Sequence, residues 1–341
     1  MKKKPPLSIR TIVGILFLIG FITAYWQWLA YRAFIETEIN LDSVETILIS
    51  KGDTVNRLAS DWQKEGIIQN AFYFKIMCWL NPELQKIRVG EYALSDAETP
   101  KSLMEKLSRG EVIQYPITFI EGMNSFQILD MIRSNALLND DLKKHPLDLV
   151  KALGIESDHI EGWIYPDTYH FTRGESATSI LKRSVKTMQS VLEKEWQNRD
   201  DNLPYNSPYE ALIMASIIEK ETSIDSEREE IAGVFVRRLQ KKMRLQTDPT
   251  VIYGIGPDFN GDITYRDLKT KTPYNTYMIN GLPPTPIAMP GRRSIYAALH
   301  PAEGETLYFV ATGDGGHYFS KTVEEHNQAV KRYLKKLRSR K

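Results

Sequence analysis

The sequence predicts an α+β protein with one N-terminal membrane-spanning helix, a small module of strands and helices, and a larger domain that mixes both. Three observations predict this architecture. Residues 12–31 are almost continuously apolar, which is long enough to cross a bilayer as a helix. Residues 44–114 combine strand patterns with capped amphipathic helices. Residues 115–341 begin with a strand and a helix and end with a strand hairpin and a helix. The length of 341 residues is enough for an anchor plus about two domains.

The N-terminal apolar run has a basic flank, formed by Lys2, Lys3, Lys4 and Arg10. Because basic flanks stay in the cytoplasm, we expect residues 1–10 to form a cytoplasmic tail, residues 11–31 to cross the inner membrane once, and the rest to lie in the periplasm. A cleavable signal peptide is the alternative. We favour an uncleaved anchor followed by a linker at residues 32–43, since bulky aromatic residues stand where a cleavage site needs small ones: Tyr25, Trp26, Trp28 and Tyr31.

Overall composition excludes several functions. The net charge is +1, which gives no electrostatic reason to expect nucleic-acid binding. The single cysteine, Cys78, rules out an intrachain disulfide, and its apolar neighbours indicate burial. The six histidines lack the spacing of metal ligands, so we expect no metal site.

The module at residues 44–114 opens with the sequence VETILISKGDTVNRLASDWQKEGII. It reads as a strand, a turn with a helix cap at Asp53 or Thr54, and an amphipathic helix. The pattern resembles a LysM module, a type that binds glycans containing N-acetylglucosamine. A small spacer that sets the height of the next domain above the membrane is an equally good interpretation.

A helical hairpin within residues 203–256 is the centre of the larger domain. Ser207 can cap a helix, Pro208 suits its first position, and Glu210 completes a capping box. The following residues are apolar on nearly every face, as in a helix buried inside a domain. A second capping box, Ser226 with Glu229, predicts another helix that runs to about residue 242.

The first helix of this hairpin ends with two glutamates, Glu219 and Glu221. Residues two apart on a helix project about 200° apart, so only one of the two carboxylates can face a given cleft. Glu221 follows Met214, Ile217 and Ile218 at helical spacing, whereas Glu219 has smaller neighbours. An apolar wall and the helix dipole both raise a carboxyl pKa, as a general acid near neutral pH requires. The alternative is that both are solvated charges at a fraying helix end.

Three further segments carry candidate residues. The aromatic and acidic run at residues 161–171 suits sugar binding, or is a packed loop. Asp248 precedes a short helix or forms an Asp-Pro turn. A loop rich in Pro and Gly carries Tyr274 and Asn275, and long loops of this kind often line active sites. His317, in the hairpin near the C-terminus, could approach the cleft, but we expect a structural role, as is commoner for a lone histidine after glycines.

Four of these runs together resemble the MltG (YceG-like) family of endolytic murein transglycosylases. They are ASIIEKET at residues 215–222, RLQTDPTVIYG at 244–254, YNTY at 274–277 and GLPP at 281–284. In that family the second glutamate of the EKE triplet is catalytic, which is Glu221 here. The resemblance implies a YceG-like catalytic domain at residues 115–341. It also implies that Gln246, Asp248, Tyr274 and Asn275 bind the sugars.

The activity implied by the resemblance is lytic cleavage of the bond between N-acetylmuramic acid and N-acetylglucosamine within peptidoglycan strands. One carboxyl group acts first as acid and then as base, a 1,6-anhydro ring closes, and no metal or organic cofactor takes part. The enzyme would end the elongation of nascent strands, with penicillin-binding proteins or other cell-wall synthases as candidate partners. The alternatives are a non-catalytic glycan-binding scaffold for these synthases, and a hydrolase that uses Glu221 with Asp248, a choice that depends on the separation of the two carboxylates.

Overall fold

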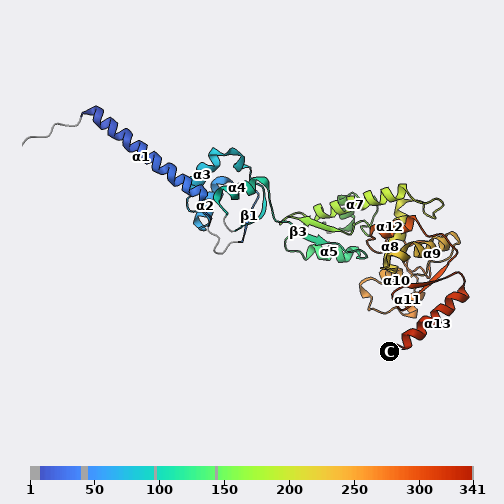
Figure 1. Ribbon diagram of the computed structural model, residues 1–341. Helices are drawn as coiled ribbons and strands as arrows, with labels where there is room; N and C mark the ends of the chain where they lie inside the picture. The colour runs from blue at the N-terminus through green and yellow to red at the C-terminus, as the bar shows by residue number, and fades with distance from the viewer. Residues whose placement is uncertain (1–7, 40–44, 96–97, 143–144, 340–341) are drawn as a thin grey trace, which may run out of the picture. The chain divides into compact units, whose positions relative to one another are not determined.

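The computed structural model describes residues 8–39, 45–95, 98–142 and 145–339 (Figure 1). The chain divides into two compact units, Met1–Tyr115 with Thr172–Gly174, and Pro116–Phe171 with Glu175–Lys341, and each has its own hydrophobic core. The three lysines of the expected cytoplasmic tail, residues 40–43 of the expected linker and residue 44 of the expected module lie outside the described residues.

The first unit begins with helix α1, Ile9–Glu36, whose first turn is capped by Ser8. Its large apolar side chains are exposed along most of its length, and within the described residues it is the one helix long and apolar enough to cross a membrane. The helix continues five residues past the expected anchor, into the expected linker. Its last turns pack against α3 (Ala71–Leu80) and α4 (Pro100–Arg109), and Phe34 is buried in the core of the first unit.

The rest of the first unit is a two-stranded antiparallel sheet covered by helices. Helix α2 begins at the cap of Thr54, and Leu58, Ala59 and Trp62 on its inner face are buried, as their spacing predicts. The likeness to a LysM module stays a prediction. The elements are β1 Thr46–Ile49, α2 Val55–Lys64, α3 Ala71–Leu80, the 3₁₀ turn Pro82–Gln85, β2 Gly90–Ala93 and α4 Pro100–Arg109.

The second unit mixes many helices with two small sheets, in which β3 pairs with β4, and β5 runs antiparallel to β6. The mixture of helices and strands predicted from the sequence is confirmed in this coarse form. The elements are β3 Tyr115–Thr118, α5 Ser125–Arg133, α6 Pro146–Leu153, β4 Thr168–Phe171, α7 Ala177–Gln197, α8 Pro208–Glu221, α9 Arg228–Gln240, α10 Asp248–Ile255, α11 Tyr265–Lys269, α12 Arg292–Leu299, β5 Tyr308–Ala311, β6 His317–Ser320 and α13 Val323–Ser339, with 3₁₀ turns at Asp225–Glu227 and Gly256–Asp258.

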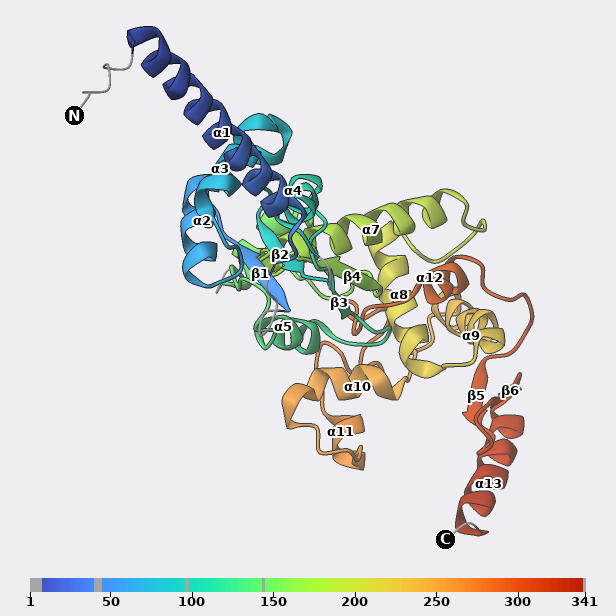
Figure 2. The same ribbon diagram turned by 60° about the vertical axis from the view of Figure 1, so that its left-hand side comes forward.

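Helix α8 is the centre of the second unit. Every residue from Ala211 to Ile218 is buried, which explains why the helix is apolar on all faces. Helices α7, α9, α10 and α12 surround it (Figure 2). Its rigid surroundings fix the position of the residue at its C-terminal end, Glu221.

The caps of the central hairpin differ in part from the sequence prediction. Ser207 caps α8 by accepting a hydrogen bond from the backbone N–H of Glu210. The Glu210 carboxylate accepts from the N–H of Asn206 instead of that of the cap residue, so the predicted box is half formed. The second predicted box is wrong: a 3₁₀ turn precedes α9, and no side chain caps that helix.

Candidate active site

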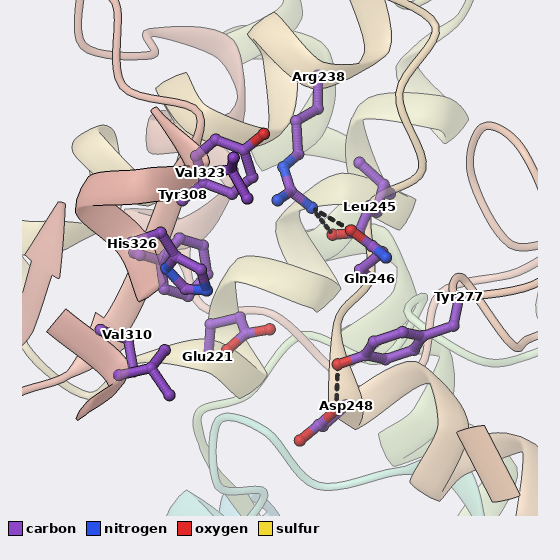
Figure 3. Close-up of a pocket in the computed structure, with 12 residues that line it drawn as sticks. Glu221, Arg238, Leu245, Gln246, Asp248, Tyr277, Tyr308, Val310, Val323 and His326 are labelled. Carbon is purple, nitrogen blue, oxygen red and sulfur yellow. Dashed lines mark hydrogen bonds between the residues drawn. The ribbon is translucent and has the colours of Figure 1, made fainter. Parts of the chain in front are cut away.

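A cavity of about 490 Å³ lies at the C-terminal end of α8 (Figure 3). Glu221, the last residue of that helix, lines it together with Gln246 and Asp248 from the segment that leads into α10. The opposite wall comes from β5 and α13. The structure therefore brings three of the five candidate site residues to one cavity.

The Glu221 carboxyl group has the environment of a general acid. Burial raises its pKa to about 7, the negative charge of Asp248 acts in the same direction, and a hydrogen bond from the Thr247 hydroxyl to Oε1 acts against them. Met214, Ile217 and Ile218, which the sequence assigned to its wall, are all buried in the core. A carboxyl group with a pKa near 7 can both donate and accept a proton at neutral pH.

The neighbouring carboxylate, Glu219, is tied into the structure. Its side chain is 6% exposed. Its Oε2 accepts hydrogen bonds from the Gly291 N–H at 3.0 Å and from the Ser294 hydroxyl at 2.8 Å, with an Arg228 nitrogen at 3.4 Å. Glu219 therefore joins α8 to α9 and α12 and does not line the cavity. The alternative in which both glutamates are solvated charges is wrong for Glu219, whose carboxylate is buried and paired, whereas Glu221 is partly exposed to the cavity.

Two polar residues of the LQTDP segment, Gln246 and Asp248, line the cavity. Gln246 has a φ of +55°, in the left-handed region, and its side-chain oxygen is 3.5 Å from an Arg238 nitrogen. The Asp248 carboxylate accepts a hydrogen bond of 2.6 Å from the Tyr277 hydroxyl. Both side chains present oxygen atoms close to Glu221, where a polar substrate could bind.

Tyr274 and Asn275 do not line the cavity. The Tyr274 hydroxyl is 2.9 Å from the Thr285 hydroxyl, and its ring packs on Tyr253 with 4.9 Å between centroids. Asn275 is 1% exposed, and its Oδ1 accepts a hydrogen bond from the N–H of Tyr277. Its amide nitrogen donates to three carbonyls at the C-terminal end of α11, those of Asp267, Leu268 and Thr270. Asn275 therefore shapes the loop that presents Tyr277.

Several polar residues at the site were not assigned a role from the sequence. Tyr277, which lines the cavity, and Thr247, which donates a hydrogen bond to Glu221, lie inside the YNTY and LQTDP runs, so those runs carried a signal for them. Three other polar lining residues come from distant parts of the chain and have no local signal in the sequence. They are Arg238 on α9, Tyr308 on β5 and His326 on α13.

Two other candidates have structural surroundings. Within the run at residues 161–171, Glu161 is 2% exposed and accepts hydrogen bonds from Ser125 and Tyr253, and burial raises its pKa. This supports the packed-loop interpretation of that run. His317 is 2.8 Å from a Glu227 carboxylate oxygen through Nδ1, a structural contact, and it also lies near enough to Glu221 to act electrostatically on the pKa of that carboxyl group, in the lowering direction.

Replacing Thr247 with Val is expected to raise the pKa of Glu221 by about one further unit, because a hydrogen bond to the charged carboxylate is lost. Thr247→Ser keeps the hydroxyl and is the matched control. The pKa can be followed by carbon NMR of labelled glutamate side chains as a function of pH. An unchanged Glu221 titration in Thr247→Val would show that this hydrogen bond does not act on the carboxyl group.

The chain is similar to known proteins over most of its length. A sequence model of the YceG-like family matches residues 47–332. The chain is 34% identical over 317 residues to the endolytic murein transglycosylase of Bacillus subtilis (strain 168), a match that covers 87% of each protein. It is 23% identical over 334 residues to that of Streptococcus pneumoniae serotype 2, covering 87% of this chain and 60% of the relative.

A solved structure matches as well. It is the 2.6 Å crystal structure of a YceG-like protein from Listeria monocytogenes, with a TM-score of 0.53 and 34% sequence identity. The match covers 83% of this chain and 98% of the other. The similarity therefore extends across both units and is not confined to the cavity.

Proposed function

Because the chain belongs to the YceG-like family, we propose that it is an endolytic murein transglycosylase, which cleaves peptidoglycan strands from within. The observation that carries this proposal is Glu221, a carboxyl group with a pKa of about 7 that lines a cavity at the end of a buried helix. Lytic cleavage needs one group that gives and then takes a proton, and such a pKa suits both steps.

In the proposed reaction, protonated Glu221 donates its proton to the glycosidic oxygen between N-acetylmuramic acid and the next sugar. The bond from the anomeric carbon to that oxygen breaks, and the muramyl C6 hydroxyl attacks the same carbon. The Glu221 carboxylate takes the hydroxyl proton as the 1,6-anhydro ring closes. Water is not consumed, and Glu221 ends the cycle protonated.

We assign supporting roles to the other residues of the site. Gln246 and Asp248 bind and orient the sugar, since their oxygen atoms line the cavity, and Tyr277 holds Asp248 through its hydroxyl. Tyr274 and Asn275 act through the shape of their loop rather than by touching substrate.

A second candidate is hydrolysis, favoured by the electrostatic influence of Asp248 on Glu221 within the same cavity. In that mechanism Asp248 would activate a water molecule or act as nucleophile. The two mechanisms leave different sugar ends. Lytic cleavage leaves 1,6-anhydro-N-acetylmuramic acid, and hydrolysis leaves its reducing form.

The test is mass spectrometry of the fragments that the purified protein releases from peptidoglycan. We expect internal fragments ending in the anhydro sugar, each lighter by one water than the product of hydrolysis. Reducing N-acetylmuramic acid ends would show a hydrolase. No fragments at all would favour the non-catalytic scaffold.

We further propose that residues 44–114 form a glycan-binding or spacer module and residues 115–341 the catalytic domain. The chain would sit in the inner membrane, with this domain in the periplasm, where it ends nascent strands beside penicillin-binding proteins or other synthases. The apolar helix α1 and the basic residues before it support this arrangement.

This topology predicts the behaviour of a C-terminal reporter. Alkaline phosphatase, which needs the periplasm to form its disulfides, is expected to be active when fused after residue 341, whereas a reporter that works only in the cytoplasm should be inactive. The same pair of reporters fused before residue 1 is the control and should give the opposite result. A cytoplasmic C-terminus would contradict the proposed location.

A further inference from the structure

Arg238 is a buried cation in the wall of the active-site cavity. It is 6% exposed, and among the residues that the structure describes no acidic side chain forms an ion pair with it. Its Nε donates to the Leu307 carbonyl and its Nη1 to the Leu245 carbonyl, both at 2.7 Å. Backbone carbonyls compensate only part of a buried charge, so Arg238 retains an attraction for an anion.

The second terminal nitrogen of Arg238 is available to a ligand. Within the described part of the chain, Nη2 donates no hydrogen bond, and the guanidinium group points into the cavity above Glu221 (Figure 3). The adjacent Arg237 provides a contrast. It lies outside this cavity and uses all three nitrogens, donating to the carbonyls of Ala302 and Thr306 and to the Thr306 hydroxyl, each at 2.8 Å. An arginine that only holds backbone segments together can thus use all of its nitrogens, so the unused Nη2 of Arg238 is not explained by such a structural role.

An imidazole lies on the same side of the cavity. His326 stacks on the Tyr308 ring with 5.3 Å between centroids, and Arg238 lies over that ring at 5.1 Å. The Nδ1 atom of His326 is buried and has no hydrogen-bond partner among the described residues. The His326 ring lines the cavity, and a buried polar atom without a partner costs free energy, so a rotation of the ring that brings this nitrogen to a ligand group would be favourable.

We propose that Arg238 and His326 form a subsite for a carboxylate of the substrate, beside the sugar on which Glu221 acts. This inference rests on the proposed function. The muramyl sugar carries a lactyl group at C3, which ends either in a free carboxylate or in a peptide whose own carboxylates lie farther out. Arg238 supplies the charge and His326 a further hydrogen bond, so the subsite selects strands with an acidic group on the lactyl arm.

The first test changes the substrate and leaves the protein intact. Strands freed of peptide by an amidase carry lactyl carboxylates, and coupling with methylamine converts these to neutral amides of similar size. We expect kcat/KM to be about 10- to 100-fold higher for the charged strands, mostly through KM, because one charge-assisted hydrogen-bonded contact is lost in the amide. Equal values for these two strands, together with no response of peptide-bearing strands to amidation of their carboxylates, would overturn the proposal.

Peptide-bearing strands identify which carboxylate is bound. If amidation of their peptide carboxylates lowers kcat/KM by the same factor, the subsite takes a peptide carboxylate. If only the peptide-free strands respond, it takes the lactyl carboxylate. The two outcomes support the subsite with different ligands, and a response in neither set contradicts it.

The second test assigns the preference to Arg238. Arg238→Gln is expected to remove most of the preference for charged strands, and Arg238→Lys to retain part of it. Arg237→Gln is the matched control: it also loses contacts to backbone carbonyls but should keep the preference. A full preference in folded Arg238→Gln would overturn the assignment.

Binding separates this proposal from the proposed function. Calorimetry with the charged and neutral strands in a Glu221→Gln background needs no turnover, and the charged strands should bind about 10- to 100-fold more tightly. Failure to cleave any strand, together with this binding difference, would contradict the enzymatic function alone. Cleavage without the binding difference would contradict the subsite alone.

Discussion

Replacing Glu221 with Gln is expected to slow cleavage of peptidoglycan strands by about 10²–10⁴-fold while the protein stays folded, because a positioned general acid typically contributes that factor. Gln has nearly the same shape and can still accept the hydrogen bond from Thr247, but its amide is not acidic and cannot transfer a proton to the glycosidic oxygen. The rate of release of soluble fragments measures the loss, and circular dichroism checks the fold. An unimpaired Glu221→Gln protein would remove the proposed mechanism.

Glu219→Gln is the matched control, two residues earlier on the same helix. The Gln oxygen can still accept from the Gly291 N–H and the Ser294 hydroxyl, but Arg228 loses one of its charged partners and keeps Asp225 at 3.2 Å. We therefore expect a lower Tm and nearly unchanged cleavage per folded molecule. Equal losses of activity in the two variants would mean that Glu221 has no special role.

Glu221→Gln is also expected to be more stable than the wild type at alkaline pH. Burial raises the pKa of Glu221 from 4.5 to about 7. The folded protein therefore holds this proton more tightly than the unfolded chain, and stability falls as pH rises from about 4.5 to 7. Below that window both states are protonated and above it both are ionised, so the penalty is absent at low pH and constant at high pH.

The variant lacks this titration, and the difference between the two proteins follows from the pKa shift. The gain in free energy of unfolding should grow from about 1 kcal/mol or less at pH 5 to about 3 kcal/mol at pH 8, since each pKa unit corresponds to about 1.4 kcal/mol. Denaturant titrations of both proteins at the two pH values measure it. A stability difference that does not change with pH would show that folding does not raise the pKa of Glu221.

The sequence identified Glu221 because its position depends on local signals. A cap at Ser207, an apolar run and helical spacing together define a buried helix and the residue at its end, and the structure has this helix. The choice against Glu219 followed from helix geometry together with the bulkier apolar neighbours of Glu221. That reasoning did not explain what holds Glu219 in place. The hydrogen bonds to its carboxylate come from the start of α12, which no local sequence pattern connects to α8.

The remainder of the cavity depends on long-range packing. Arg238, Tyr308 and His326 meet through contacts between α9, β5 and α13, and nothing in their neighbourhoods predicts the meeting. In the YNTY loop the side chains follow neither a helical nor a strand period. The sequence therefore pointed to a loop that does reach the cavity, but it could not distinguish Tyr277, which lines the cavity, from Asn275, which is buried and does not.

The continuity of helix α1 has a mechanical consequence for the proposed anchor. Its 28 residues extend for about 42 Å, more than the roughly 30 Å of a bilayer's hydrocarbon layer, and its last turns are part of the first unit's core through Phe34. The helix is continuous from the proposed anchor into that unit, without a flexible joint between them. A change in the tilt of α1, caused by bilayer thickness or by another membrane helix packing against it, would therefore rotate the first unit by the same angle relative to the membrane.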